Sequence, residues 1–107
     1  MKQPHECFDM TEIRAEIDRL DLQTIALIGE RFGYVKAASR FKSSVSAVAA
    51  PERFASMLIQ RRIWAAEVGL DPDAIETLYR NLVTHFIEVE TRLFRESQGE
   101  PGKIEQS

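Results

Sequence analysis

The stretch from Asp9 to Lys42 constrains the fold more than any other part of the chain. Its apolar residues recur at helical spacing and no proline interrupts it, so it predicts one continuous helix ending near Phe41 or Lys42. Such a helix would be roughly 50 Å long at 1.5 Å per residue. Its apolar stripe consists of Ile13, Ile17, Leu20, Leu27, Ile28, Phe32, Val35 and Ala38.

A helix of this length needs cover that the remaining residues of a 107-residue chain cannot supply within one compact domain. We therefore expect a dimer in which the long helices of two copies pair. The alternative is a monomeric bundle in which the helix breaks near Gly29 and Gly33. These two glycines would either admit a close neighbour or be tolerated at a cost of about 1 kcal/mol each.

Two further helices are predicted, over residues 51–68 and 72–97, and no strand pattern is present. Pro51 suits a first helical position, Gly69 suits a position just beyond a helix end, and Asp71 followed by proline is a strong start signal. Residues 43–50 are predicted to be a loop. The expected organisation is an N-terminal arm (1–8), an all-α domain (9–97) and a disordered tail (98–107).

Composition excludes several classes of function. Hydrophobic residues make up 44% of the chain and charged residues 29%, which is typical of an ordinary globular protein. The net charge of −3 argues against nucleic-acid binding. The single cysteine, Cys7, and the absence of a signal-peptide pattern or a membrane-spanning apolar run favour a cytoplasmic protein. His5 and His85 are isolated, so no metal site is expected.

Three cations lie on or beside the apolar stripe. Lys42 follows Arg31 by eleven residues, which would place the two about 20° apart on one helix face, with Val35 between them. This arrangement suits a dianion, although a solvated basic edge is the plain alternative. Arg14 is too far along the helix to share a small ligand with Lys42 in one chain. Alone, it would be a surface arginine paired with Asp18.

Glu90 is an unusual carboxylate because its helical neighbours are apolar: Val83, Phe86, Ile87 and Phe94. A carboxylate in such surroundings protonates more readily unless a cation lies against it. A protonated glutamic acid would be a hydrogen-bond donor. The alternative is a residue at the rim of the apolar face that reaches water.

The segment IRAEIDRLDLQTIALIGERFGYVKAASRFK resembles the first helix of the all-α chorismate mutase family. The segments YVKAASRFK, APERFASML and WAAEVGLDP are particularly similar to one branch, the isochorismate pyruvate lyases of salicylate and siderophore biosynthesis. The resemblance extends over about residues 7–95. It implies an intertwined homodimer of three-helix chains with two equivalent sites for a dicarboxylate substrate, and neither a cofactor nor a metal.

The resemblance also implies roles for individual residues. Arg31 and Lys42 would bind the carboxylates and ether oxygen of the substrate, and Arg14 would come from the partner chain. Glu90 stands where the lyase branch usually has glutamine, which contacts the substrate near its ether oxygen. Residues 43–50 would close over the substrate. Apolar walls would be formed by Val35, Val48, Met57, Phe86 and Ile87.

The resemblance implies one of two catalytic functions, and a third hypothesis comes from a different class of protein. The first is an isochorismate pyruvate lyase with chorismate mutase side activity, favoured by Phe54 at a position where dedicated mutases have a glutamate. The second is a chorismate mutase that forms prephenate, favoured by the departure of Glu90 from glutamine. The third is a non-catalytic helical dimer that binds an aromatic carboxylate.

Overall fold

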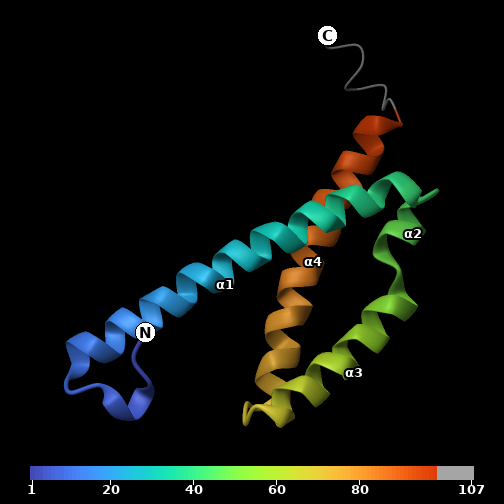
Figure 1. Cartoon of the computed structure of the whole chain (residues 1–107). Coiled ribbons are helices and arrows are strands. Elements are labelled where there is room, and N and C mark those ends of the chain that lie inside the picture. Colours follow the sequence, from blue (N-terminus) through green and yellow to red (C-terminus); the bar gives the residue numbers. More distant parts are fainter. Residues whose placement is uncertain (99–107) are drawn as a thin grey trace. The chain divides into compact units, whose positions relative to one another are not determined.

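The computed structural model describes residues 1–98 of the chain, and all regular elements within this range are helical (Figure 1). The prediction of an all-α fold with three main helices is confirmed. The chain divides into two compact units, residues 1–34 and the part from residue 35 onward. The elements in order are η1 (Pro4–Glu6), α1 (Met10–Ala38), η2 (Ser39–Phe41), α2 (Val45–Ala49), α3 (Pro51–Glu67) and α4 (Pro72–Ser97).

The start of α1 is stabilised by hydrogen bonds and an ion pair among the residues before and within its first turn. The Asp9 carboxylate accepts from the backbone N–H of Glu12 at 2.9 Å, as expected for an N-cap. The Glu12 carboxylate accepts from the N–H of Phe8 at 2.8 Å and forms an ion pair with Lys2 at 3.0 Å. The Phe8 hydrogen bond and then Lys2 lower the pKa of Glu12. The segment before α1 thus contains a short 3-10 helix and folds back on the first turn.

The long helix ends earlier than the sequence predicted. It stops at Ala38, and the next three residues form the 3-10 turn η2. The Ser39 hydroxyl donates to the carbonyl of Lys36 at 2.6 Å, and Arg40 Nε donates to the carbonyl of Ala37 at 3.2 Å. These side chains satisfy carbonyls at the helix end, where continuation of the helix would otherwise do so.

Residues 43–50 are not the plain loop that was predicted, because they contain the five-residue helix α2. Ser44 caps this helix by accepting from the N–H of Ala47 at 3.0 Å. Ala50 then adopts a left-handed conformation, with φ 42° and ψ 62°, and α3 begins at Pro51. A non-glycine residue there carries some backbone strain, and it turns the chain sharply between α2 and α3.

Helices α3 and α4 form an antiparallel hairpin (Figure 1). Gly69 has φ +80° just beyond the end of α3, and Asp71 caps α4 by accepting from the N–H of Asp73 at 2.9 Å. Both features were predicted from the sequence, as was the end of α4 at Ser97. The tail predicted for residues 98–107 lies outside the described residues, except for Gln98.

The core of the second unit lies where α2 and α3 pack on α4. Its buried apolar residues are Val48, Met57, Leu58, Ala65 and Phe86, and one charged residue, Glu90, is buried with them. By contrast, α1 has no buried residue. The core is therefore small and is centred on α4, which carries both Phe86 and Glu90.

Candidate active site

The most unusual group in the second unit is the carboxylate of Glu90. Its side chain is 4% exposed, and its Oε2 atom lies 3.2 Å from Nζ of Lys42, whose side chain is 25% exposed. No hydrogen bond from the described residues, 1–98, reaches this Oε2 atom. Burying a carboxylate is costly unless a cation or hydrogen bonds compensate it, so Glu90 depends on the ion pair with Lys42. The alternative of a water-reaching rim residue is therefore wrong.

The turn after α1 brings Lys42 to this position. Lys42 follows η2 in an extended conformation, with φ −101° and ψ 136°, and its N–H donates to the carbonyl of Ser39. The separation of about 20° from Arg31 assumed helical geometry as far as residue 42, and that argument is wrong because α1 ends at Ala38.

The residues predicted to form apolar walls come from four helices and differ in burial. Val48 of α2 and Met57 of α3 are 2% and 3% exposed, and Phe86 of α4 is 9% exposed. Phe86 lies one helical turn before Glu90 and therefore on the same face of α4. Val35 and Ile87 are half-buried. Of these residues, Phe86 is thus placed by helical spacing on the same face of α4 as the carboxylate, while the assignment of the others to the walls stays a prediction.

The two arginines predicted to bind substrate belong to the first unit, on α1. Arg14 is exposed and Arg31 is half-buried. Among residues 1–98, no ion pair joins Arg14 to Asp18, so the surface pairing considered from the sequence is absent from this part of the chain. Their roles stay predictions.

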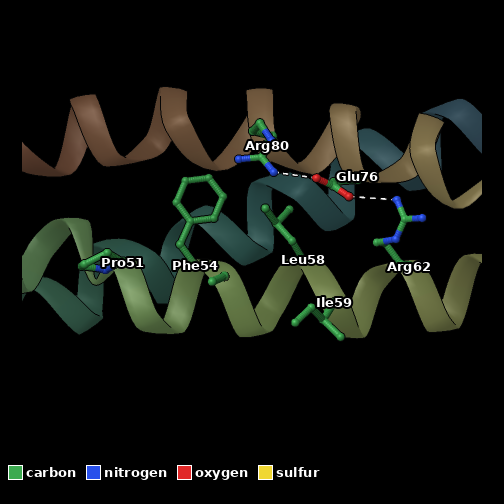
Figure 2. A pocket seen from close by; sticks show the side chains of 8 residues that line it. Pro51, Phe54, Leu58, Ile59, Arg62, Glu76 and Arg80 are labelled. Carbon is green, nitrogen blue, oxygen red and sulfur yellow. Dashed lines mark hydrogen bonds and ion pairs between the residues drawn. The ribbon is translucent and has the colours of Figure 1, made fainter.

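A groove between α3 and α4 was missed by the sequence reasoning. It has a volume of about 390 Å³, and Figure 2 shows the side chains that line it. We call it the α3–α4 groove. Its lining consists of an apolar part (Pro51, Phe54, Ala55, Leu58, Ile59) and a charged part (Arg62, Glu76, Arg80).

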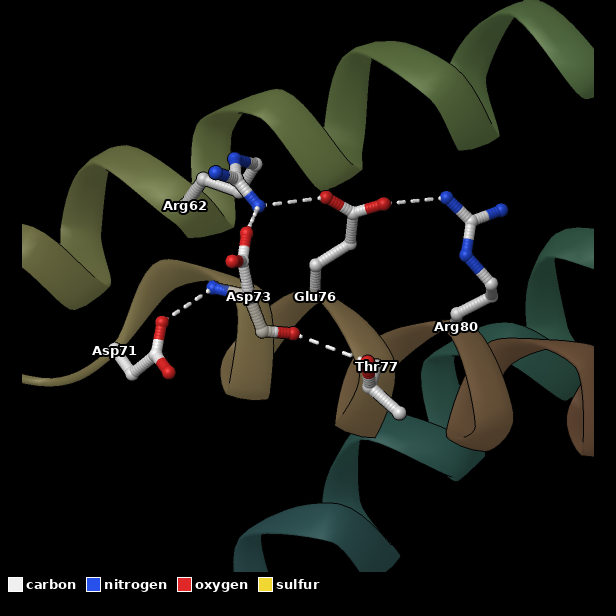
Figure 3. Close-up of polar contacts among 6 residues, drawn as sticks. All are labelled: Arg62, Asp71, Asp73, Glu76, Thr77 and Arg80. Atoms are coloured by element: carbon white, nitrogen blue, oxygen red, sulfur yellow. Dashed lines mark hydrogen bonds and ion pairs between the residues drawn. The ribbon is translucent and has the colours of Figure 1, made fainter.

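The charged part of the groove belongs to a hydrogen-bonded network that connects the two helices (Figure 3). Arg62 Nη1 donates to Asp73 at 2.7 Å and to Glu76 at 2.8 Å, and Arg80 Nη2 donates to the other oxygen of Glu76 at 2.5 Å. The guanidinium of Arg80 and then that of Arg62 lower the pKa of Glu76. The i,i+4 spacing of Glu76 and Arg80 was a signal available in the sequence.

The Lys42–Glu90 pair offers one cation and one carboxylate. Within residues 1–98, no group of three or more His, Cys, Asp or Glu side chains is arranged to hold a metal ion. A carboxylate–ammonium pair of this kind can position an anionic ligand and give or accept one hydrogen bond.

The comparisons with known proteins define the family. Residues 13–91 match the profile of the family described as chorismate mutase type II. This match covers more than half of the chain, and the protein belongs to that family.

Individual relatives are similar over different extents. The chain is 43% identical over 99 residues to the isochorismate pyruvate lyase of Pseudomonas aeruginosa. The matched region covers 92% of this chain and 98% of that protein. It is 34% identical to the T-protein of Enterobacter agglomerans over 70% of this chain, and 33% identical to that of Haemophilus influenzae over 69%. The matched region spans only 20% of each T-protein.

No helix within residues 1–98 is both long and apolar enough to cross a membrane.

Proposed function

We propose that the protein is an isochorismate pyruvate lyase, which converts isochorismate to salicylate and pyruvate, with chorismate mutase as a side activity. The observation that carries the proposal is the buried Glu90 carboxylate paired at 3.2 Å with Lys42. It occurs in a chain that is similar to an isochorismate pyruvate lyase along 98% of that enzyme's length. A cytoplasmic location is part of the proposal.

The proposed reaction is a concerted elimination that needs no external nucleophile, acid or oxidant. The bond between the ring carbon and the ether oxygen breaks while a ring hydrogen moves to the methylene carbon of the enolpyruvyl arm. The arm leaves as pyruvate and the ring becomes aromatic as salicylate. The protein's task is to hold the arm over the ring and to stabilise negative charge that develops on the ether oxygen.

In this proposal Lys42 supplies the main stabilisation of that charge. Its ammonium group lies 3.2 Å from the buried carboxylate of Glu90 on α4, and partial burial strengthens its interaction with an oxyanion. Without substrate, Glu90 holds the ammonium group in place. With substrate bound, an ionised Glu90 would repel the ether oxygen, whereas a protonated Glu90 donates a hydrogen bond to it.

The remaining charges of the substrate are assigned to Arg31 and, from a second copy of the chain, to Arg14. Support for a homodimer comes from α1, which carries an apolar stripe but has no buried residue. Ile17 and Leu20 are each 50% exposed and Leu27 is 62% exposed. Apolar side chains in such a row favour association with another helix. The predicted 9–97 domain is the unit that would dimerise.

A chorismate mutase that forms prephenate is the second candidate. Glu90 favours it, because a carboxylic acid replaces the glutamine usual in the lyase branch. Phe54 argues against it, because a phenyl ring cannot accept a hydrogen bond from a substrate hydroxyl. A dimer that only binds an aromatic carboxylate is the third possibility.

Direct assays separate these candidates. Incubation with isochorismate should produce salicylate fluorescence with saturation kinetics, and incubation with chorismate should show a slower loss of chorismate absorbance. A faster reaction with chorismate would favour the mutase. Turnover of neither substrate, with binding of either detected by calorimetry, would leave only the non-catalytic dimer.

A further inference from the structure

The first turn of α1 carries a set of polar contacts that the proposed reaction does not use. The Asp9 carboxylate accepts from the N–H of Glu12 at 2.9 Å. The Glu12 carboxylate accepts from the N–H of Phe8 at 2.8 Å and pairs with Lys2 at 3.0 Å. We call these four residues the N-terminal cap of α1. All of the contacts lie within one short stretch of a single chain, so they form without a contribution from a second copy.

The N-terminal cap lies near Arg14 in the sequence but on another side of the helix. At 100° per residue, Arg14 is about 160° around the helix axis from Glu12. The Glu12 side chain, which meets the residues before the helix, is 31% exposed, whereas Arg14 is exposed. The cap therefore acts on the first turn of α1 and leaves the guanidinium group of Arg14 uncovered.

The backbone of Arg14 depends on this first turn. In an α-helix each N–H donates to the carbonyl four positions earlier, which for Arg14 is the carbonyl of Met10, the first residue of α1. The N–H of Ile13 donates to the carbonyl of Asp9 at 3.1 Å. Because α1 has no buried residue, packing within the chain does not hold this turn. Loss of the cap is therefore expected to let the turn fray and to open both hydrogen bonds.

Fraying of the first turn should impair substrate binding more than the chemical step. When only a fraction of the protein has the conformation that binds, the apparent affinity falls in proportion to that fraction. Saturating substrate restores the binding conformation, so the rate at saturation is retained. The expected signature is a raised KM with an unchanged kcat.

We propose that Glu12 is a positioning residue, which acts through the N-terminal cap to hold Arg14 where it binds a carboxylate of the substrate in the site of the other subunit. This inference rests on the proposed function and deepens it, because it names the residue that orders the contribution of each chain to its neighbour's site.

The test uses heterodimers of two differently tagged chains, one of which carries Lys42→Ala. Only one of the two sites then keeps Lys42, and that site takes its Arg14 from the Lys42→Ala chain. Glu12→Ala on this same chain should raise KM for isochorismate about fivefold, as expected for the loss of a helix cap, with kcat unchanged. Glu12→Ala on the other chain should leave KM unchanged, because the Arg14 of that chain serves the inactive site.

Three further variants test the contacts themselves. Glu12→Gln keeps an oxygen that accepts from the N–H of Phe8, so it should restore most of the affinity. Asp9→Ala removes the other carboxylate of the cap and should raise KM in the same arrangement, which keeps the proposal testable if Glu12→Ala fails to fold. Glu88→Ala, which changes an exposed glutamate of α4, is the matched control and should leave KM unchanged.

A measurement without substrate examines the first turn directly. In ¹⁵N relaxation experiments on the homodimer, Glu12→Ala should lower the order parameters of the Ile13 and Arg14 amides from about 0.85, typical of rigid backbone, to below about 0.6. Amides that stay rigid in Glu12→Ala would overturn the proposal.

Equal KM values in the two heterodimer arrangements, with isochorismate still turned over, would overturn the positioning role alone and leave the proposed function standing. Absence of isochorismate turnover in the wild-type protein would overturn the proposed function, and the positioning role with it. The two failures are therefore distinguishable by the wild-type assay.

Discussion

Glu76 and Glu90 both lie on helix α4 and both form ion pairs, and their surroundings differ. The Glu76 side chain is 28% exposed, and both of its oxygens accept hydrogen bonds from arginines. The Glu90 side chain is 4% exposed, and its Oε2 atom faces Lys42 at 3.2 Å and accepts no hydrogen bond from residues 1–98. Both oxygens of the half-buried Glu76 carboxylate are thus hydrogen-bonded, while the buried Glu90 carboxylate is incompletely compensated.

This difference indicates what each pair does. An exposed, fully bonded network links α3 to α4 and contributes modestly to stability, because water competes for its charges. For a buried carboxylate with a single ion pair, the free energy of desolvation is larger than the electrostatic attraction to one lysine readily offsets. Groups held in such a state occur often at functional sites, which is why we assign the chemistry to Lys42 and Glu90.

The largest expected effect is that of Lys42→Ala. Loss of the ammonium group should lower kcat for isochorismate by about 10²–10³, as when a main oxyanion-stabilising group is removed. Arg92→Ala, which removes an exposed cation of α4 outside the Lys42–Glu90 pair, should keep a near wild-type rate and serves as the control. Near wild-type turnover of a folded Lys42→Ala dimer would remove the basis for the site assignment.

The next effect concerns the assignment of Arg14 to the partner chain. Arg14→Ala and Lys42→Ala should each be nearly inactive alone. Co-expression should restore about a quarter of wild-type activity, because half of the randomly formed dimers contain one intact site of two. Native mass spectrometry measures the heterodimer fraction. Heterodimers without recovered activity would show that the two residues do not serve one shared site.

A smaller effect is expected from the replacement of Glu90. A glutamine at this position offers an amide N–H to the ether oxygen, which an ionised carboxylate would repel, so Glu90→Gln should raise kcat for isochorismate by about tenfold. Glu88→Gln, at an exposed position of α4, should leave kcat unchanged and serves as the control. An unchanged or lower rate in a folded Glu90→Gln protein would refute the role of Glu90.

The smallest effect concerns the exposed network. Because Arg80 and Arg62 lower the pKa of Glu76 below its ordinary value of 4.5, the network stabilises the fold at pH values above 4.5. That stabilisation is lost as pH falls through the lowered pKa. Urea unfolding should therefore show Glu76→Gln slightly less stable than wild type at neutral pH, with a difference that shrinks in acid. A difference independent of pH would contradict the role of its charge.

Local signals in the sequence were sufficient for most of the helical framework. Pro51, Gly69 and Asp71 act through backbone geometry that a single residue imposes on its neighbours, so the limits of α3 and α4 followed from them. The end of α1 did not follow. There the Ser39 and Arg40 side chains compete for helix carbonyls, and periodicity does not report that competition.

The sequence by itself determined the all-α class, the apolar stripe of α1 and the identity of the charged residues near it. Only the tertiary structure decided that Lys42 meets Glu90 and that Arg62 and Arg80 share Glu76. Lys42 and Glu90 are 48 positions apart in the chain. Their contact depends on the turn after α1 and on the packing of α2 against α4, which together place the two side chains beside each other. Helical spacing relates only residues within one helix, so it cannot predict such a contact.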